Sequence, residues 1–443
     1  MRLVDTRNPR ATATFRDAVL QSVAPSGGLW VPEPVPVFDD WPELLALDWG
    51  ERSLVLLDRE LGGEIPRRDL ARAVGRALDF PVPLVPLAGL AGGPSSSGAV
   101  GTFALELFHG PTLAFKDFGA RFFAAVLDLL REPGRAVTIL TATSGDTGAA
   151  VARAFWRRQG VRVVVLYPSG RVSPLQELQL ATLGENVTAA RVAGSFDDCQ
   201  ALVKAAFADA ALAARHGLTS ANSINVARLL PQVLYDAEAL AQLRRRGIAS
   251  PPVIAVPSGN FGNLYAGLLA RAMGLPIPVL VAATNANSTV PDYLETGDYR
   301  PRPSVATLSN AMDVGAPGNW ERIERLFDRA HDGRALAALR GALRWGRQSD
   351  DETRRRIREL AAAGYLADPH AAVAYGVLRE RLRAGETGVF LATAHPAKFL
   401  PLYEELGIEV SVPEPLARLR DRPLLAREMP NDSAALSSLL DAG

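Results

Sequence analysis

Short apolar runs alternate with helical patterns along most of the chain. The runs are rich in β-branched residues and lack polar alternation, which is typical of strands buried on both faces of a sheet. Strands that alternate with helices predict βαβ units, and so an α/β fold with parallel sheets flanked by helices. The predicted strands are 136–142, 161–167, 252–257, 278–284 and 388–393, and the predicted helices are 67–78, 148–158, 197–208, 226–243 and 262–273.

The first part of the chain differs in composition from the rest. Proline and glycine clusters such as FPVPLVPLAGLAGGPSSSG surround its helical segments. Residues 92–98 have the composition of a connector. We therefore predict an N-terminal domain over residues 1–98.

The composition and the net charge exclude several classes of function. The 443 residues are 48% hydrophobic and carry 48 basic and 48 acidic side chains, so the formal net charge is zero. A neutral chain lacks the basic surface of nucleic-acid binders, and no apolar run reaches the length of a membrane span. The single cysteine, Cys199, excludes an intrachain disulfide and a cysteine metal cage. We expect a cytoplasmic globular protein without a metal, nucleic-acid or membrane partner.

Lysine is rare in this chain, which uses arginine for 45 of its 48 basic residues and lysine only at Lys116, Lys204 and Lys398. Lysine can form an imine and can lose its proton when it is desolvated, whereas arginine does neither. Lys204 lies in a helical pattern and is interpreted as a solvated surface residue. Lys116 and Lys398 lie in unusual surroundings and are candidates for chemistry.

Three turns between a predicted strand and the following segment carry specialised residues. They are Thr143–Gly148, Ser258–Asn263 and 394–398, the last with the sequence AHPAK. In open parallel sheets such turns bind ligands, because backbone N–H groups converge at the helix N-termini. Ser258–Asn263 fits either a phosphate cradle or an ordinary tight turn. Thr143–Gly148 fits either a carboxylate or phosphate site or a capped helix start, and its surplus of hydroxyls favours the ligand.

Lys116 stands in an apolar segment, LFHGPTLAFKDF, between Phe115 and Phe118. Such surroundings depress the pKa of an ammonium group, as an imine-forming or proton-shuttling lysine requires. A lysine at a helix start that pairs with Asp117 would have the same sequence. An activatable lysine, a phosphate cradle and a hydroxyl-rich loop together suit pyridoxal phosphate acting on an amino acid.

Several longer motifs closely resemble those of the threonine synthase family, in its longer bacterial and fungal branch. They occur in the family's order and cover nearly the whole chain: FRDAVLQSVAPSGGLWVP (15–32), FHGPTLAFKDFGARF (108–122), LTATSGDTGAAVA (140–152), SANSINVARL (220–229), PSGNFGN (257–263), ATLSNAMDVG (306–315) and HPAKF (395–399).

This resemblance implies the tryptophan-synthase-β-like fold, which is pyridoxal phosphate fold type II, with an extra N-terminal domain. It also implies a large cofactor-binding domain over 99–130 and 220–443 and a smaller mobile domain over 131–219. The implied reaction converts O-phospho-L-homoserine and water into L-threonine and phosphate, as the last step of threonine biosynthesis. The sequence leaves open whether the protein is a monomer or a homodimer.

The resemblance also assigns roles to individual residues. Lys116 would bind the cofactor covalently and move protons, and Thr393 would face its pyridine nitrogen. Asp146 stands where relatives of this fold place an asparagine beside the phenolic oxygen. The cofactor phosphate would be held by Gly259, Asn260, Phe261, Gly262 and Asn263. The substrate carboxylate would be bound by Thr143, Ser144 and Thr147. The substrate phosphate would be bound by Ser223 and Arg228, with help from Lys398.

Two other functions compete with this interpretation. A dehydratase or sulfhydrylase of the same fold would share the lysine and the glycine loop but would not need Ser223 and Arg228. A non-catalytic relative that only binds a phosphorylated ligand would have lost the lysine, and Lys116 is present.

Overall fold

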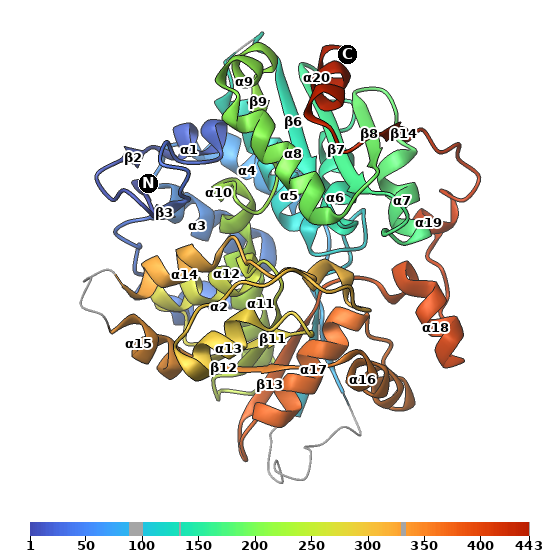
Figure 1. The fold of residues 1–443 in the computed structure, drawn as a ribbon. Coiled ribbons are helices and arrows are strands. Elements are labelled where there is room, and N and C mark those ends of the chain that lie inside the picture. The colour runs from blue at the N-terminus through green and yellow to red at the C-terminus, as the bar shows by residue number, and fades with distance from the viewer. Residues whose placement is uncertain (88–100, 133, 329–333, 443) are drawn as a thin grey trace.

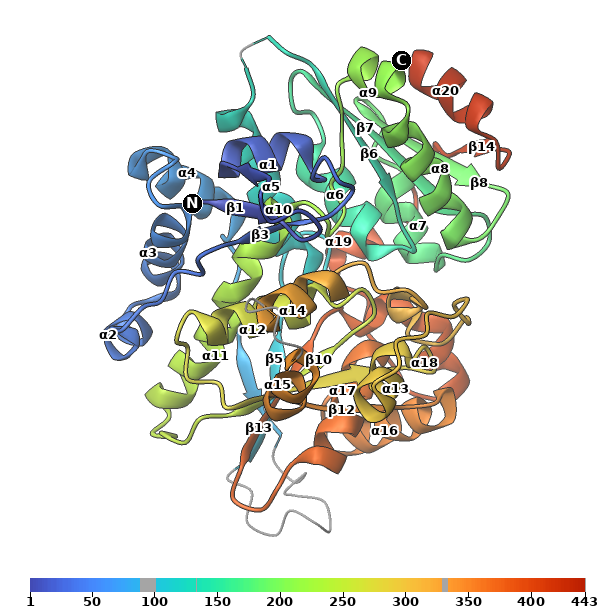
Figure 2. The same ribbon diagram turned by 60° about the vertical axis from the view of Figure 1, so that its left-hand side comes forward.

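The computed structural model describes residues 1–87, 101–132, 134–328 and 334–442. These residues form a small antiparallel sheet and two larger sheets that are almost entirely parallel (Figures 1 and 2). The predicted α/β class is therefore confirmed. The predicted connector at 92–98, and with it the boundary at 98, lies outside the described residues.

The larger sheet has six strands and contains three of the five predicted ones. Each of the three begins and ends within one residue of its prediction. All neighbours are parallel except the edge pair β4 and β5. In order, the strands are β12 (Leu343–Arg347), β11 (Val279–Thr284), β10 (Val253–Pro257), β13 (Thr387–Ala392), β5 (Gly101–Glu106) and β4 (Leu84–Pro86).

Both faces of this sheet are buried, as the unbroken apolar runs require. Ile254 and Val256 of β10 pack into the cluster that contains helix α12 (Gly262–Ala272). Val253 and Ala255, between and beside them, pack into the cluster that contains helix α17 (Pro369–Arg381). The helix that follows β10 therefore covers one face, and a helix from later in the chain covers the other.

The second parallel sheet has five strands and contains the other two predicted ones. Alternate residues of β7 again pack into two different apolar clusters. Val163 and Val165 belong to the cluster that also contains α5 (Lys116–Leu130) and α12, and Val164 and Leu166 belong to the cluster of α8 (Phe196–Ala208) and α20 (Ser433–Asp441). In order, the strands are β14 (Arg427–Met429), β8 (Val187–Val192), β7 (Val161–Pro168), β6 (Val137–Ala142) and β9 (Leu218–Thr219).

In two places the strand pairing differs from the predicted domain limits. β14 extends the edge of β8 and α20 packs beside it, although the large domain was predicted to run through 220–443. This pairing covers what would otherwise be an open sheet edge. β4 joins the larger sheet, although its residues were assigned to the N-terminal domain. Elsewhere the domain limits stay a prediction.

The N-terminal region packs directly onto the rest of the molecule. Its apolar side chains belong to the same cluster as α5 (Lys116–Leu130) and α12. Trp41 donates from its ring nitrogen to the carbonyl of Met273 at 3.0 Å. Its elements are β1 (Leu3–Asp5), β2 (Thr12–Ala13), α1 (Phe15–Gln21), β3 (Trp30–Pro32), α2 (Trp41–Ala46), α3 (Trp49–Leu61) and α4 (Arg67–Ala77).

The helix predicted at 226–243 is divided in three. It consists of α10 (Val226–Leu229), the 3-10 turn η1 (Leu230–Gln232) and α11 (Val233–Arg245). Pro231 lies in the turn, where its missing N–H and its ring disfavour a regular α-helix. After the interruption, α10 packs against α5, whose first residue is Lys116.

The remaining helices surround the two parallel sheets. In the part of the chain that the structure describes, none is long and apolar enough to cross a bilayer. They are α6 (Asp146–Phe155), α7 (Pro174–Ala181), α9 (Ala210–His216), α13 (Thr289–Thr296), η2 (Asn310–Met312), α14 (Trp320–Phe327), α15 (Ala335–Ala342), α16 (Asp350–Ala362), η3 (Pro396–Phe399), α18 (Leu400–Leu406) and α19 (Glu414–Ala417).

Two helical glycines give a matched test of the contact between α5 and α10. A Cβ at Gly119 of α5 would lie 2.5 Å from the carbonyl oxygen of Arg228, whereas a Cβ at Gly75 of α4 would meet nothing within 4 Å. We expect Gly119→Ala to destabilise the protein by about 1–3 kcal/mol through overpacking. Gly75→Ala should stabilise it by about 0.5–1 kcal/mol, because alanine favours a helix. Thermal midpoints of both variants check this, and equal midpoints would contradict the close packing.

Candidate active site

The loop before Lys116 and the loop after β13 run side by side between the two parallel sheets. The Phe115 amide donates to the Thr393 carbonyl at 2.8 Å, and the His395 amide donates to the Leu113 carbonyl at 3.0 Å. These bonds form an antiparallel bridge between Ala114 and Ala394, beyond the end of the parallel pairing of β5 with β13. They bring the predicted cofactor residues Lys116 and Thr393 into one region.

Lys116 is the first residue of α5 and is half-buried. Its ammonium nitrogen lies 4.2 Å from the centre of the Phe115 ring. Burial, reinforced by the positive charge of Arg228 and opposed by Asp146, lowers the pKa of Lys116 to about 7. An amine with such a pKa can both accept and return a proton near neutral pH. The apolar environment expected from the sequence is therefore present.

The glycine loop leads from β10 into α12. Phe261 immediately precedes the helix with φ of +58°, and the amides of the first helical turn are available for an anion. A Cβ at Gly259 would lie 2.5 Å from the Cα of Met312, so only glycine fits there. The side-chain nitrogen of Asn263 is buried without a hydrogen-bond partner in the described residues.

Ser223 is held against this glycine loop by two amides. Its hydroxyl accepts hydrogen bonds from the side chain of Asn260 at 2.9 Å and from that of Asn319 at 3.0 Å. Asn319 also donates to the carbonyl of Asn260 at 3.0 Å. Sequence reasoning missed Asn319, which stands alone in the segment APGNW and carries no motif signal of its own.

Arg228 lies in α10 and is almost fully buried, with 2% of its surface exposed. Its guanidinium donates to the carbonyl of Ala221 at 2.6 Å, while its Nε has no partner among the described residues. Burial lowers the pKa of Arg228 to about 10, against a smaller opposing effect of Asp117. A buried cation with an unused donor is suited to bind an anion.

One hydroxyl of the loop before α6 forms hydrogen bonds with the backbone of the loop itself. The Thr143 hydroxyl accepts from the amides of Gly145 at 3.0 Å and Gly148 at 2.8 Å, and it donates to the Gly145 carbonyl at 3.2 Å. The prediction that Thr143 binds the substrate carboxylate therefore does not fit these contacts, because its hydroxyl is fully engaged. Ser144 and Thr147 are half-buried and keep the predicted role as a hypothesis.

The alternative role of Thr143 can be tested by substitution. Thr143→Val would leave two buried amides without an acceptor, which costs about 1–3 kcal/mol for each unsatisfied group. We expect a lower thermal midpoint for Thr143→Val and recovery in Thr143→Ser, which keeps the hydroxyl. A raised KM with an unchanged midpoint in the valine variant would instead favour a role in substrate binding.

Asp146 and Lys398 form a buried ion pair, in contrast to their separate predicted roles. The Lys398 ammonium lies 2.6 Å from the Asp146 carboxylate, with side-chain exposures of 0% and 5%. Burial alone would raise the pKa of Asp146, but Lys398, with smaller effects of His370 and Gln176, makes the net shift downward. Asp146 is therefore ionised and directed to Lys398, and the contacts of Lys398 give no support to its predicted help for Ser223 and Arg228.

His395 is positioned by the same loop. Its Nδ1 accepts a hydrogen bond from the Ala397 amide at 3.1 Å. Burial, with the nearby His109 and Lys398, lowers the pKa of His395 to about 4. The ring is therefore neutral near pH 7 and caps the short helix η3, which favours a structural role.

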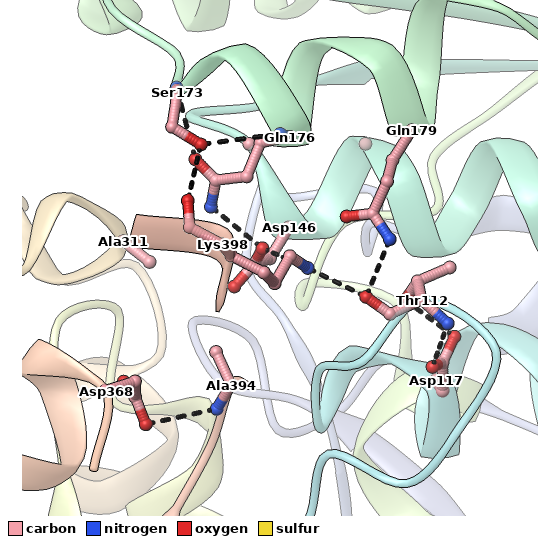
Figure 3. A network of polar contacts seen from close by, with 12 residues as sticks. Thr112, Asp117, Asp146, Ser173, Gln176, Gln179, Ala311, Asp368, Ala394 and Lys398 are labelled. Carbon is pink, nitrogen blue, oxygen red and sulfur yellow. Dashed lines mark hydrogen bonds and ion pairs between the residues drawn. The ribbon is translucent and has the colours of Figure 1, made fainter. Parts of the chain in front are cut away.

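Sequence reasoning missed the polar side chains that surround the ion pair (Figure 3). Gln176 donates to Asp146 at 2.8 Å, and Gln179 donates to the carbonyl of Thr112 at 2.9 Å. Both glutamines come from α7, whose start is marked in the sequence by the capping box of Ser173 and Gln176. That signal predicts a helix but not what the helix contacts.

Comparisons with known proteins agree with this geometry. The family model for pyridoxal-phosphate-dependent enzymes matches residues 77–394, and models for the N-terminal and C-terminal parts of threonine synthase match 2–78 and 371–440. A threonine synthase from Haemophilus influenzae is 48% identical over 99% of both chains. The chain belongs to the threonine synthase family.

Solved structures of the threonine synthase family have the same fold. The crystal structure of threonine synthase from Escherichia coli has a TM-score of 0.92 and 45% identity and covers 100% of both chains. A pyridoxal-phosphate-bound threonine synthase from Brucella melitensis has a TM-score of 0.90 and 36% identity, covering 100% of this chain and 99% of that one. The predicted fold, with its N-terminal domain, is confirmed.

The residues of this threonine synthase family member fit pyridoxal phosphate. Lys116 supplies an amine whose pKa is lowered to about 7, and the glycine loop leads into α12, whose first-turn amides have no partner within the helix. Arg228 Nε and Asn263 Nδ2 are buried donors without partners in the described part of the chain. A cation, unused donors and exposed helix amides are suited to phosphate groups.

Proposed function

We propose that this protein is a threonine synthase, which converts O-phospho-L-homoserine and water into L-threonine and phosphate. The observation that carries the proposal is the half-buried Lys116, whose pKa is lowered by burial and by the buried Arg228. Similarity to threonine synthases over the whole chain supports the same conclusion.

The cofactor would be held by residues from three loops. Lys116 would bind it covalently, the loop Gly259–Asn263 would hold its phosphate, and Thr393 would face its pyridine nitrogen. When bound, pyridoxal phosphate withdraws electrons from the amino acid and so makes its carbon-bound protons acidic. Because Asp146 is paired with Lys398, we do not assign it to the phenolic oxygen.

Two anion sites would orient the substrate. Ser144 and Thr147, at the start of α6, would bind its carboxylate with hydroxyls and helix amides. Arg228 would bind its phosphate with the donor that it does not use within the protein, and Ser223 would assist from beside the glycine loop. Holding both ends of the substrate fixes the reacting carbons relative to Lys116.

Lys116 would serve as the proton carrier. Once its Nζ is released by the substrate amine, it can take the proton from Cα and later one from Cβ. It can return one proton to Cγ after the phosphate has left and the other to Cα after water has added its hydroxyl at Cβ, while the second proton of water goes to the released phosphate. A pKa near 7 suits both directions of transfer. Arg228 would stabilise the departing phosphate, because a buried guanidinium pairs strongly with phosphate oxygens.

The two parallel sheets meet at this site, so a relative movement of them would control access to it. We infer that residues 131–219, together with β14 and α20 on the same sheet, form the smaller mobile domain and close over the substrate, which would exclude water from the early proton transfers. A cytoplasmic location and assembly as a monomer or homodimer are part of the same proposal.

The proposed function is tested by one assay of the purified protein with pyridoxal phosphate and O-phospho-L-homoserine. We expect threonine and free phosphate in equal amounts. Phosphate accompanied by 2-oxobutyrate in place of threonine would contradict the proposal and favour an eliminating relative. Ligand binding without turnover would favour the non-catalytic alternative.

A further inference from the structure

The pair of Asp146 and Lys398 joins the two parallel sheets at their boundary. Asp146 begins α6, which follows β6 of the smaller sheet, and Lys398 lies in η3, which follows β13 of the larger sheet. Their charged atoms are 2.6 Å apart and neither side chain is more than 5% exposed. Figure 3 shows the two side chains pointing toward each other, with Gln176 and Thr112 beside them.

Each member of the pair is held by further contacts. The Lys398 ammonium also donates to the Thr112 carbonyl at 2.8 Å, and the backbone carbonyl of Lys398 accepts from the Ser173 hydroxyl at 2.9 Å. Gln176 donates to the same carboxylate oxygen of Asp146 that faces Lys398. A buried charge without a partner is costly, so these contacts keep the two charges together.

The same contacts lead to Lys116. Thr112 lies four residues before it, and both the amide and the hydroxyl of Thr112 donate to Asp117, the next residue along, at 2.8 and 2.9 Å. The Asp146 carboxylate acts on Lys116 through space and raises its pKa, against burial and Arg228. A negative charge at this place that no cation neutralised would keep Lys116 in its protonated form.

The other charged and titratable groups around this centre do not replace Lys398. Arg228 faces Lys116, and His370 and His395 face Asp146 and Lys398. His370 is held by Asp368, whose carboxylate lies 2.6 Å from Nδ1, and its Nε2 accepts from the Ala311 amide at 3.2 Å. Both ring nitrogens of His370 therefore have partners of their own, and neither is bonded to Asp146.

We propose that Lys398 is a positioning residue that neutralises the Asp146 carboxylate and so leaves the Lys116 amine free to lose its proton. This inference rests on the role of Lys116 in the proposed function. It also gives a reason for a lysine in a chain that uses arginine almost everywhere else. A compact ammonium fits between one carboxylate and one carbonyl, whereas a planar guanidinium has five donors to satisfy.

The small number of lysines allows a direct measurement of charge at Lys116. Full-length protein labelled with [ε-13C]lysine should give three signals, for Lys116, Lys204 and Lys398, and each can be titrated by NMR after the cofactor has been removed. Lys204 is exposed and serves as the internal control. Lys116→Ala assigns the signal of interest.

We expect Lys398→Met to raise the pKa of Lys116 by about one unit or more, because the Asp146 charge is then uncompensated. The double variant Asp146→Asn/Lys398→Met should return it to the value in the unsubstituted protein. If the pair only held the two sheets together, the double variant would not restore the pKa of Lys116. An unchanged Lys116 pKa in Lys398→Met, or a shift that persists in the double variant, would overturn the inference without affecting the proposed reaction.

A second measurement covers the case in which Lys398→Met does not fold. In the unsubstituted protein, the Lys398 signal should keep the chemical shift of an ammonium throughout the pH range in which Lys116 titrates. Loss of the Lys398 proton before that of Lys116 would overturn the inference, because no charge would remain to neutralise Asp146.

Discussion

Replacing Lys116 by alanine is expected to abolish formation of both threonine and phosphate, with a loss of at least about 10³-fold. The variant loses the amine that would bind the cofactor and carry every proton. No other lysine can take its place, because Lys398 is paired with Asp146 and Lys204 lies on the exposed face of α8. The measurement is the rate of release of each product from O-phospho-L-homoserine.

Lys204→Ala is the matched control for this experiment, because it removes one of the three lysines from a solvent-exposed position. It should retain full activity. Lys116→Ala should also keep the thermal midpoint of the unsubstituted protein within a few degrees. Persistent threonine formation in a folded Lys116→Ala protein would contradict the assignment of the proton carrier.

Arg228→Met should produce the second largest loss. Removing a charge-assisted hydrogen bond to a phosphate costs about 1.5–3 kcal/mol, which corresponds to a rise in KM for O-phospho-L-homoserine of about 10- to 100-fold. Inorganic phosphate should lose inhibitory strength by a similar factor, since it would occupy the same site. Steady-state kinetics with phosphate as the inhibitor measures both effects.

Two further variants separate phosphate binding from a loss of structure. Arg228→Lys keeps a positive charge and should lie between the unsubstituted protein and Arg228→Met. Arg340→Met removes an arginine of α15 that also donates to a carbonyl, that of Leu294 at 2.8 Å, and it should leave both constants unchanged. Unaltered phosphate inhibition in a folded Arg228→Met protein would show that the phosphate binds elsewhere.

The parallel strands were predictable because their residues carry a local signal. A run such as VRVVVLY at 161–167 is apolar at nearly every position, which only burial on both faces explains. β12 and β14 have no such signal: β12 reads LRWGR and β14 is three residues long. They are strands because they pair with the edges of β11 and β8, which is a property of the neighbours.

In the candidate site, too, some features follow from local sequence and others depend on the tertiary structure. Lys116 and the glycine loop could be identified from the sequence, because each combines a special residue with a place beside a strand. Resemblance to a family assigned separate roles to Asp146 and Lys398, but 252 positions separate them along the chain and no local pattern connects them. Thr143 was assigned to the substrate because a hydroxyl in a loop has the same sequence whether it binds a ligand or its own backbone.

The sequence by itself determined the α/β class, the family and the lysine on which the chemistry depends, since these follow from periodicity, motif order and the rarity of lysine. Tertiary structure decided which charges meet, which edges are covered and which hydroxyls are already used. These depend on distances between segments far apart in the chain, where desolvation makes the choice of partner decisive. The pairing of Asp146 with Lys398 is the clearest case, because neither charge could be buried without the other.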